Sequence, residues 1–330
     1  MDYINYVKQS PMSMGGMGGV VGSYNFRAAA GGGGNDCSGT GTYYGGRGLH
    51  IGGNNSPVDI IGYFTINSTG NAQDFGDLTV ARLGGAAASN ETRSVSGGGQ
   101  GYTDVMDYVT VASTGNATDF GELNDARGYI AACSNGVRGV WGGGWNGSTA
   151  FSAMEFVCLG TAQSASSFGS LSPAIAGGTG SAMAGGSNGE RGVWMNGHDG
   201  SGGSNAIQYF DIETTGNASD FGESGVSAWG RGGVSNTTRM VASGGYYDST
   251  MDYITIASTG NSSNFGSLDT NGNGMGGANN SPRGVFMGGE GAGNVLQYIT
   301  IASTGNSTDF GDSVNPGNNN YMWGNSGGGN

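Results

Sequence analysis

The chain has 330 residues, of which 73 are glycine and 11% are charged, and its formal net charge is −13 at pH 7. Lys8 is its single lysine, and phosphate binding needs clustered cations, so this composition argues against a nucleic-acid-binding protein. A content of 10% aromatic residues with only five prolines argues against a disordered low-complexity chain and favours glycines at the turns of an all-β fold.

The chain begins MDYINYVKQS, which contains no apolar run of signal-peptide length. No window approaches the 18 apolar residues of a transmembrane segment. We therefore expect synthesis in the cytoplasm, without membrane insertion. Met1–Val7 has the pattern of a β-strand, whereas residues 8–46 fit the repeat that follows poorly.

From residue 47 onward the chain repeats itself every 44 to 53 residues. A period of this length indicates a β-propeller or a solenoid. The segment MDYVTVASTGNATDFGEL, from Met106, returns from Met251 as MDYITIASTGNSSNFGSL. A Phe-Gly pair marks each copy, with its phenylalanine at Phe75, Phe120, Phe168, Phe221, Phe265 and Phe310. A second marker is an arginine that opens an apolar run, at Arg47, Arg93, Arg138, Arg191, Arg239 and Arg283.

Each copy divides into four short extended pieces, which is the content of one propeller blade. The clearest examples of the first to the fourth piece are Arg127–Ser134, Arg138–Trp141, Tyr253–Ala257 and Phe75–Leu78. Turns of the type Ser-Thr-Gly-Asn separate the third piece from the fourth, and their glycines adopt positive φ at low cost.

Six copies lie between residues 24 and 312, and both ends of the chain carry a further strand-like piece. Met1–Val7 resembles a third strand and Tyr321–Gly324 a first or second strand. Their pairing predicts a seventh four-stranded blade that closes the ring and removes open sheet edges. The sequence thus predicts one propeller domain over residues 1–330, with seven blades, and six blades as the alternative.

The arginine-led strand, the glycines that end it, the tyrosine of the third strand and the aromatic residue before the fourth resemble the kelch repeat. Phe75 and its counterparts stand where kelch repeats usually carry tryptophan. Strings such as DYVTVASTGNATDFGEL, from Asp107, are similar to glycine-rich kelch-like proteins of tailed bacteriophages, especially marine and cyanobacterial ones.

This resemblance implies a virion structural protein of the tail, a fibre or a capsid appendage, acting in assembly or host-surface attachment. Its implied partners are other virion proteins, copies of itself and a host surface glycan. The alternative function is a glycan-binding, lectin-like propeller. Kelch motifs specify a fold far better than a function.

The sequence shows no recognisable catalytic site, and we expect neither an enzyme nor a resident cofactor. The only histidines are His50, in a strand-like run that favours packing, and His198, in a loop; no motif places either beside a nucleophile. Cys37, Cys133 and Cys158 have no metal-ligand or redox spacing, so we interpret them as small buried apolar residues.

Carboxylates flank most Phe-Gly pairs. Because carboxylates bind calcium, a calcium site is the one metal site that we keep as an alternative. They precede the pair at Asp74, Asp119, Asp220 and Asp309 and follow it at Asp77, Glu122, Glu223 and Asp312. Their spacing matches no calcium loop. We expect them instead to cap turns or to pair with a second set of repeat arginines, Arg82, Arg127 and Arg231.

The remaining candidates for ligand contact lie in the loops after the second strands, which vary most in length and sequence. The candidate surface residues are Trp145, Asn146, His198, Asp199, Tyr246 and Tyr247. Trp141 and Trp194 lie within strand-like runs, so we expect both to pack in the core.

Overall fold

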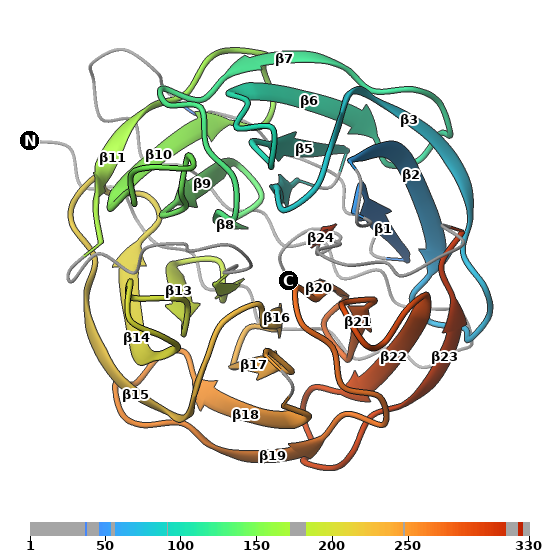
Figure 1. The fold of residues 1–330 in the computed structure, drawn as a ribbon, viewed down its shortest axis with the longest axis vertical. Helices are drawn as coiled ribbons and strands as arrows, with labels where there is room; N and C mark the ends of the chain where they lie inside the picture. Colours follow the sequence, from blue (N-terminus) through green and yellow to red (C-terminus); the bar gives the residue numbers. More distant parts are fainter. Residues whose placement is uncertain are drawn as a thin grey trace, which may run out of the picture.

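The computed structural model describes Cys37 and residues 46–53, 57–90, 92–171, 183–246, 248–314 and 323–325. These residues form strands, turns and bends without a helix, and the strands assemble into six four-stranded antiparallel sheets. The sheets stand as blades around a common axis, as in a β-propeller (Figure 1). The all-β fold and its four-stranded blades are as the sequence predicts. In the described part of the chain, no helix has the length and apolar character required to span a lipid bilayer.

Each blade runs from an inner strand near the axis to an outer strand at the rim (Figure 1). We number the blades 1 to 6 from the one that contains β1. The inner strands, in blade order, are β24 (Trp323–Asn325), β4 (Ala86–Ser89), β8 (Ala131–Ser134), β12 (Ala184–Ser187), β16 (Gly232–Ser235) and β20 (Gly276–Asn279). The second strands are β1 (Arg47–Ile51), β5 (Arg93–Gly97), β9 (Arg138–Gly142), β13 (Arg191–Met195), β17 (Arg239–Ser243) and β21 (Arg283–Met287).

The third strands are β2 (Val58–Thr65), β6 (Val105–Thr110), β10 (Ala153–Cys158), β14 (Ser204–Asp211), β18 (Thr250–Thr255) and β22 (Val295–Thr300). The outer strands are β3 (Gln73–Arg82), β7 (Thr118–Glu122), β11 (Ser166–Ser170), β15 (Ser219–Ala228), β19 (Ser263–Ser267) and β23 (Thr308–Asp312). The four predicted pieces of the repeat thus correspond to the four strands of a blade.

The ring closes through β24, the last strand among the described residues, which pairs antiparallel with β1, the first of them (Figure 1). The preference for seven blades is therefore wrong and the six-blade alternative is correct. A strand near Tyr321–Gly324 does close the ring, but it completes the blade of β1, β2 and β3 and does not start a seventh. The predicted strand at Met1–Val7 lies outside the described residues.

The Phe-Gly pair marks a β-bulge that recurs in every blade. In blade 2, Met106 is opposite Gly121 and Asp107 is opposite Asp119, so Phe120 is the extra residue of the outer strand. The bulge turns this ring into the core, where Phe120 is 2% exposed. Gly121 then adopts φ +140°, a conformation that favours glycine.

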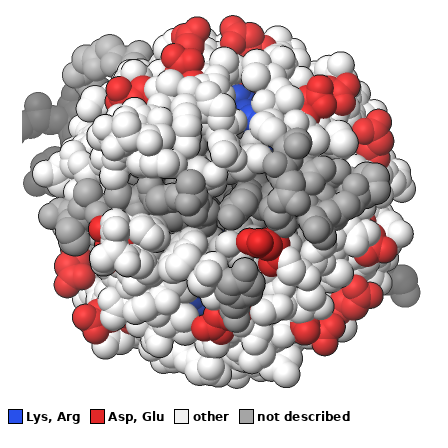
Figure 2. Space-filling model, viewed as in Figure 1, with Lys and Arg blue, Asp and Glu red and all other residues white. Residues whose placement is uncertain are grey.

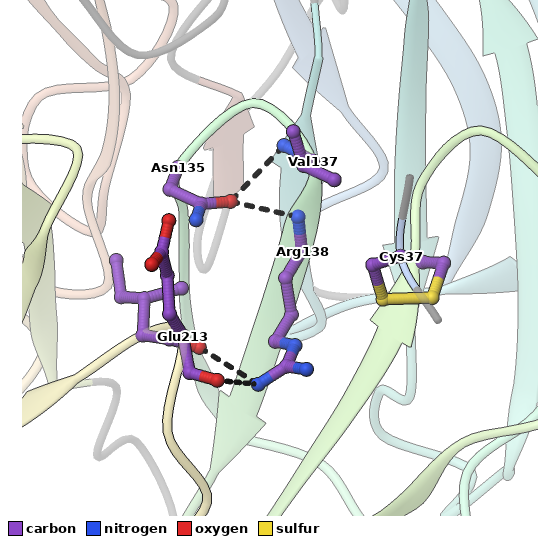
Figure 3. The surroundings of a disulfide bond; sticks show 7 residues. Cys37, Asn135, Val137, Arg138 and Glu213 are labelled. Carbon is purple, nitrogen blue, oxygen red and sulfur yellow. Dashed lines mark hydrogen bonds between the residues drawn. A yellow bond between two sulfur atoms is a disulfide. The ribbon is translucent and has the colours of Figure 1, made fainter. Parts of the chain in front are cut away.

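The arginines that open the second strands join each blade to the next. Their guanidinium groups donate to backbone carbonyls of the following blade, with N to O distances of 2.7 to 3.1 Å. Each also lies 4.2 to 4.6 Å from the ring centroid of a third-strand aromatic residue in its own blade. In Figure 3, Arg138 of blade 3 reaches the carbonyl of Glu213, which follows β14 of blade 4. This ring of arginines is part of the fold.

Small residues surround the axis. The second residue of each inner strand takes the same register position, and these residues are Ala87, Ala132, Gly185, Gly233, Gly277 and Gly324. A Cβ atom on Gly185 would lie 2.5 Å from the carbonyl oxygen of Ala132 in the neighbouring blade. Hydroxyl groups join the same strands: Ser134 Oγ donates to the Ser89 carbonyl at 2.6 Å. The inner strands therefore pack backbone against backbone.

Two of the three cysteines form a disulfide, Cys37–Cys158, with 4.9 Å between their Cα atoms (Figure 3). Both side chains are buried, as expected from the sequence, but the bond between them was not predicted. The positions are 121 residues apart in the chain, and only the fold brings them together. Cys133 is free and buried as expected, and burial raises the pKa of its thiol.

Candidate functional site

The connections between strands divide the ring into two faces of different character. In an antiparallel blade, the loop from the second to the third strand lies on the same side as the connection from the outer strand to the next inner strand. We call this side the loop face. The remaining turns, between inner and second strands and between third and outer strands, form the turn face.

The turn face is nearly uniform from blade to blade. In the turns after five inner strands, an asparagine Oδ1 accepts from the backbone N–H of the residue three positions later, at 2.6 to 2.9 Å. In the turns before five outer strands, another asparagine Oδ1 accepts from the outer strand of the preceding blade, at 3.0 to 3.2 Å. These repeated side chains hold turns and blades together, so this face presents a structural surface.

The loop face differs at every blade, and all the predicted surface residues within the described chain lie on it. Trp145 and Asn146 belong to the loop between β9 and β10, His198 and Asp199 to the loop between β13 and β14, and Tyr246 to the loop between β17 and β18. Tyr247 lies outside the described residues. The structure thus places these candidates on three adjacent blades.

Asn146 and Asp199 use their side chains to shape their own loops. Asp199 Oδ1 accepts from the backbone N–H groups of Ser201 and Gly202, at 2.9 and 3.0 Å, and from the Ser201 hydroxyl at 2.7 Å. The pKa of Asp199 is lowered, mainly by the hydrogen bonds that its carboxylate accepts from Ser201. Asn146 Oδ1 accepts in the same way from Ser148 and Thr149. Both side chains act as turn formers.

An aromatic cluster joins His198 and Tyr246 through a third residue, Trp229. The rings of Trp229 and Tyr246 stack with centroids 4.4 Å apart and 20° between their planes. The ring of His198 meets Trp229 edge to face at 5.3 Å. Tyr246 is 48% exposed, and Trp229 and His198 are half-buried. Trp229 was not among the predicted surface residues, because its sequence surroundings indicate a position in or beside a first or second strand, where aromatic residues mostly pack between blades.

Trp145 belongs to a separate aromatic pair. Its ring meets Tyr102, from the loop between β5 and β6 of blade 2, edge to face at 5.7 Å. Both rings are half-buried, and burial raises the pKa of Tyr102. The sequence candidates therefore separate into two clusters, one between blades 2 and 3 and the other between blades 4 and 5.

The strand residues with large rings are buried, as predicted. Trp141 and Trp194 are fully buried, and Trp141 Nε1 donates to the Ala86 carbonyl of the neighbouring blade at 3.1 Å. His50 is also fully buried and faces Gly62, and its Nε2 accepts from the Val314 N–H at 3.4 Å. Desolvation lowers the pKa of His50 to about 4, so the ring is neutral at neutral pH.

Three further arginines form buried ion pairs, but with acids other than those we expected. Arg82 pairs with Asp107, Arg127 with Glu155 and Arg231 with Asp252, each acid lying in a third strand of the next blade. The expected pairing with the acids around Phe-Gly is therefore wrong. Those acids lie on the outer strands, at the rim, whereas the guanidinium groups lie inside the ring.

Arg231 reaches its pair from a different place in the chain. Relative to the inner strand that follows, it stands three positions later than Arg82 and Arg127. Its Nη2 nevertheless donates to the carbonyl of Thr250 at 2.9 Å, and Arg82 Nη1 donates to the carbonyl of Val105, the equivalent third-strand residue, at the same distance. The expectation that these arginines share one repeat position is thus wrong for Arg231, although its guanidinium group occupies an equivalent site.

The charge left at the surface is acidic. All nine arginines of the described chain are engaged, six in the contacts between blades and three in the buried pairs. Figure 2 shows acidic residues around the circumference, where basic residues are scarcely visible. Among the described residues, no three His, Cys, Asp or Glu side chains gather in a group that could hold a metal ion.

Fold and surface together define a six-bladed all-β propeller with a uniform turn face, an acidic rim and a varied loop face that carries two aromatic clusters. No protein-family model matches this chain, and no curated protein is similar to it in sequence.

Proposed function

We propose that this chain is a non-enzymatic, kelch-like structural protein of a tailed bacteriophage virion. In this role it acts as a rigid module of the tail, a fibre or a capsid appendage, in assembly or in attachment to the host surface. Its partners are other virion proteins and copies of itself. The resemblance of its repeats to phage proteins suggests the setting.

The observation that carries the proposal is the contrast between the two faces. Every blade repeats the arginine contact and the bulge, and five blades repeat each of the two asparagine contacts of the turn face. The loops between second and third strands, in contrast, contain six to ten residues and differ in sequence. Such an arrangement suits a rigid support for varied contacts, because loops on a fixed scaffold tolerate change without loss of the fold.

The positions of the reactive side chains also support a role without catalysis. His50 and Cys133 are fully or almost fully buried, and burial favours the neutral form of both. The ring of His198 contacts that of Trp229, and its Nδ1 accepts from the backbone N–H of Gly200 at 3.0 Å. General-base catalysis needs a histidine within hydrogen-bond reach of a nucleophile.

The test is to find the protein in purified particles. Mass spectrometry of gradient-purified virions, followed by cryo-EM reconstruction, is expected to recover the chain and place a six-bladed ring in the density of a tail, fibre or capsid surface. Absence of the chain from particles that are otherwise complete would overturn the proposal.

A glycan-binding propeller is the second candidate, favoured by the aromatic side chains on the loop face. Stacking on aromatic rings is a common means of holding the apolar face of a sugar. A glycan array probed with the folded protein is expected to show binding. A silent array, with the fold verified by circular dichroism, would contradict this candidate.

A further inference from the structure

We propose that the cluster of His198, Trp229 and Tyr246, at the junction of blades 4 and 5, is a binding site for a neutral pyranose sugar. This inference deepens the glycan-binding candidate and rests on it. It does not depend on the location of the protein in a virion.

The other blade junctions provide an internal comparison. At four junctions, the N–H of a loop residue donates to the carbonyl of a residue in the preceding connection. The four donor and acceptor pairs are Gln100 with Leu83, Trp145 with Gly128, Tyr246 with Trp229, and Glu290 with Asn273. The same backbone contact thus accepts Leu, Gly or Asn on one side and Gln or Glu on the other. Among these four, only the junction of blades 4 and 5 has aromatic side chains on both sides.

The fold therefore does not require the two stacked rings at this place. Tyr246 is also accessible: it and Val80 are the large apolar side chains that are exposed within the described chain. An exposed, ordered aromatic side chain on a varied face indicates a contact with a ligand.

The chemistry around the rings fits a sugar. Trp229 and Tyr246 stack nearly parallel, so Trp229 holds the Tyr246 ring in place and the outer face of the exposed Tyr246 ring is left for the C–H groups of a pyranose. Because the Gly200 N–H donates to His198 Nδ1, the neutral imidazole carries its proton on Nε2, where it serves as a hydrogen-bond donor. Asp199, the next residue, is exposed, and its Oδ1 is held by the loop. A rigid aromatic platform with polar groups beside it is the usual composition of such sites.

The charge of the surroundings favours a neutral sugar over an anionic one. The nearest arginine in the chain, Arg231, is fully buried and pairs with Asp252. Asp199 is the charged side chain adjacent to the cluster in the sequence, and its pKa is lowered, so it is ionised at neutral pH. A carboxylated or sulfated sugar would meet this negative charge with no described cation to balance it.

The decisive variant replaces Trp229 and Tyr246 by the residues that the junction of blades 1 and 2 carries, Leu83 and Gln100. The double variant W229L/Y246Q keeps side chains that this backbone contact already accepts. The matched control is W145Q, which removes one of the two aromatic residues of the other cluster and likewise installs the glutamine of Gln100.

The probes are methyl β-D-glucopyranoside, methyl β-D-galactopyranoside and methyl α-D-mannopyranoside, with N-acetylneuraminic acid as the anionic comparison. Saturation-transfer-difference NMR at about 10 mM ligand detects a site of millimolar Kd, since such a site is then mostly occupied. We expect a signal from at least one neutral pyranoside, retained in W145Q and reduced at least tenfold in W229L/Y246Q.

An equal signal in W229L/Y246Q and the wild type would overturn the assignment of the site. No signal from any neutral pyranoside would overturn the site and the glycan-binding candidate together, and a stronger signal from N-acetylneuraminic acid would overturn the neutral class. Unchanged circular dichroism and melting temperature verify that each variant is folded. The presence of the protein in virions is measured separately, so failure of the virion proposal and failure of this site are distinguishable.

Discussion

At the scale of single residues, the glycines of this chain differ in whether their position could accept a side chain. The glycine of each Phe-Gly pair lies against the backbone of the turn in the next blade, and a Cβ atom at Gly266 would meet the carbonyl group of Gly305 well inside van der Waals contact. A Cβ atom at Gly305 would meet no other atom within 4 Å, and the φ of Gly305 lies outside the range from +20° to +160° that side chains rarely adopt. The two sides of this contact therefore differ in their need for glycine.

We predict that Gly266→Ala lowers the free energy of unfolding by about 2–4 kcal/mol, because alanine adds both a clash and a strained φ of +152°. Gly305→Ala is expected to change it by less than about 1 kcal/mol, on the stabilising side. Urea titration of both variants measures the difference. Equal effects would show that the contact does not restrict Gly266.

His50 makes stability depend on pH. Its pKa is about 4 in the folded state and 6.5 in the unfolded chain, so below pH 6.5 the unfolded chain binds the additional proton. The free energy of unfolding is expected to fall by about 3 kcal/mol between pH 6.5 and pH 4 from this group alone, at about 1.4 kcal/mol per pKa unit. Above pH 6.5 the group has no effect.

The matched variant for this prediction is His50→Gln, which keeps an acceptor near the position of Nε2 and removes the titration. Chemical denaturation at a series of pH values is expected to show a shallower fall between pH 6.5 and pH 4 for His50→Gln than for the wild type. Parallel curves would contradict the role of His50.

At the scale of the strands, the third strand carries the polar residue that decides how neighbouring blades meet. At one register position it presents Gly62, Asp107, Glu155, Gln208, Asp252 and Gln297. The acids receive a buried arginine. Gln297 instead accepts from the Thr270 N–H at 2.9 Å and donates to its carbonyl at 2.6 Å. At this register position, some contacts between blades are therefore ion pairs, whereas the contact of Gln297 is made of neutral hydrogen bonds.

We predict that Asp107→Gln lowers the free energy of unfolding by about 3–5 kcal/mol, because Arg82 is then buried without its counter-charge. The double variant Arg82→Met/Asp107→Gln is expected to recover most of this loss, since it removes both charges. Thermal and urea unfolding of the two variants provide the test. A double variant no more stable than Asp107→Gln would contradict the explanation.

At the scale of the whole molecule, repetition determined how far the sequence could predict the fold. The strand pattern recurs six times, and this repetition identified the blade and its four strands. The loops after the second strands could be predicted as the site of ligand contact because they vary in length and sequence. The blade count failed because Met1–Val7 resembles a third strand, although β24 alone completes the blade of β1. The partners of Arg82 and the bond of Cys37 could not be predicted, because each depends on which side chains the closed ring brings together. The contacts of Trp229 with His198 and Tyr246 were missed for the same reason, since these two residues come from two other loops.

Closure through β24 predicts that the last strand is essential to the ring. Deletion of residues 323–330 would expose the inner edge of β1, which otherwise pairs with β24. We expect this truncated chain to lose its cooperative thermal transition or to aggregate, as measured by calorimetry and light scattering. A truncated chain that melts like the full chain would show that β24 is dispensable.

The disulfide between Cys37 and Cys158 also sets the path along which the molecule bears mechanical load. A pull applied to the chain before Cys37 passes through the sulfur atoms into β10 of blade 3, a strand that pairs with β9 on one side and β11 on the other. It bypasses the 120 residues in between, which include all the strands of blade 2. With the bond intact, such a pull would act on the body of the ring at blade 3. After reduction, the first described strand that it would reach is β1, in the blade that closes the ring.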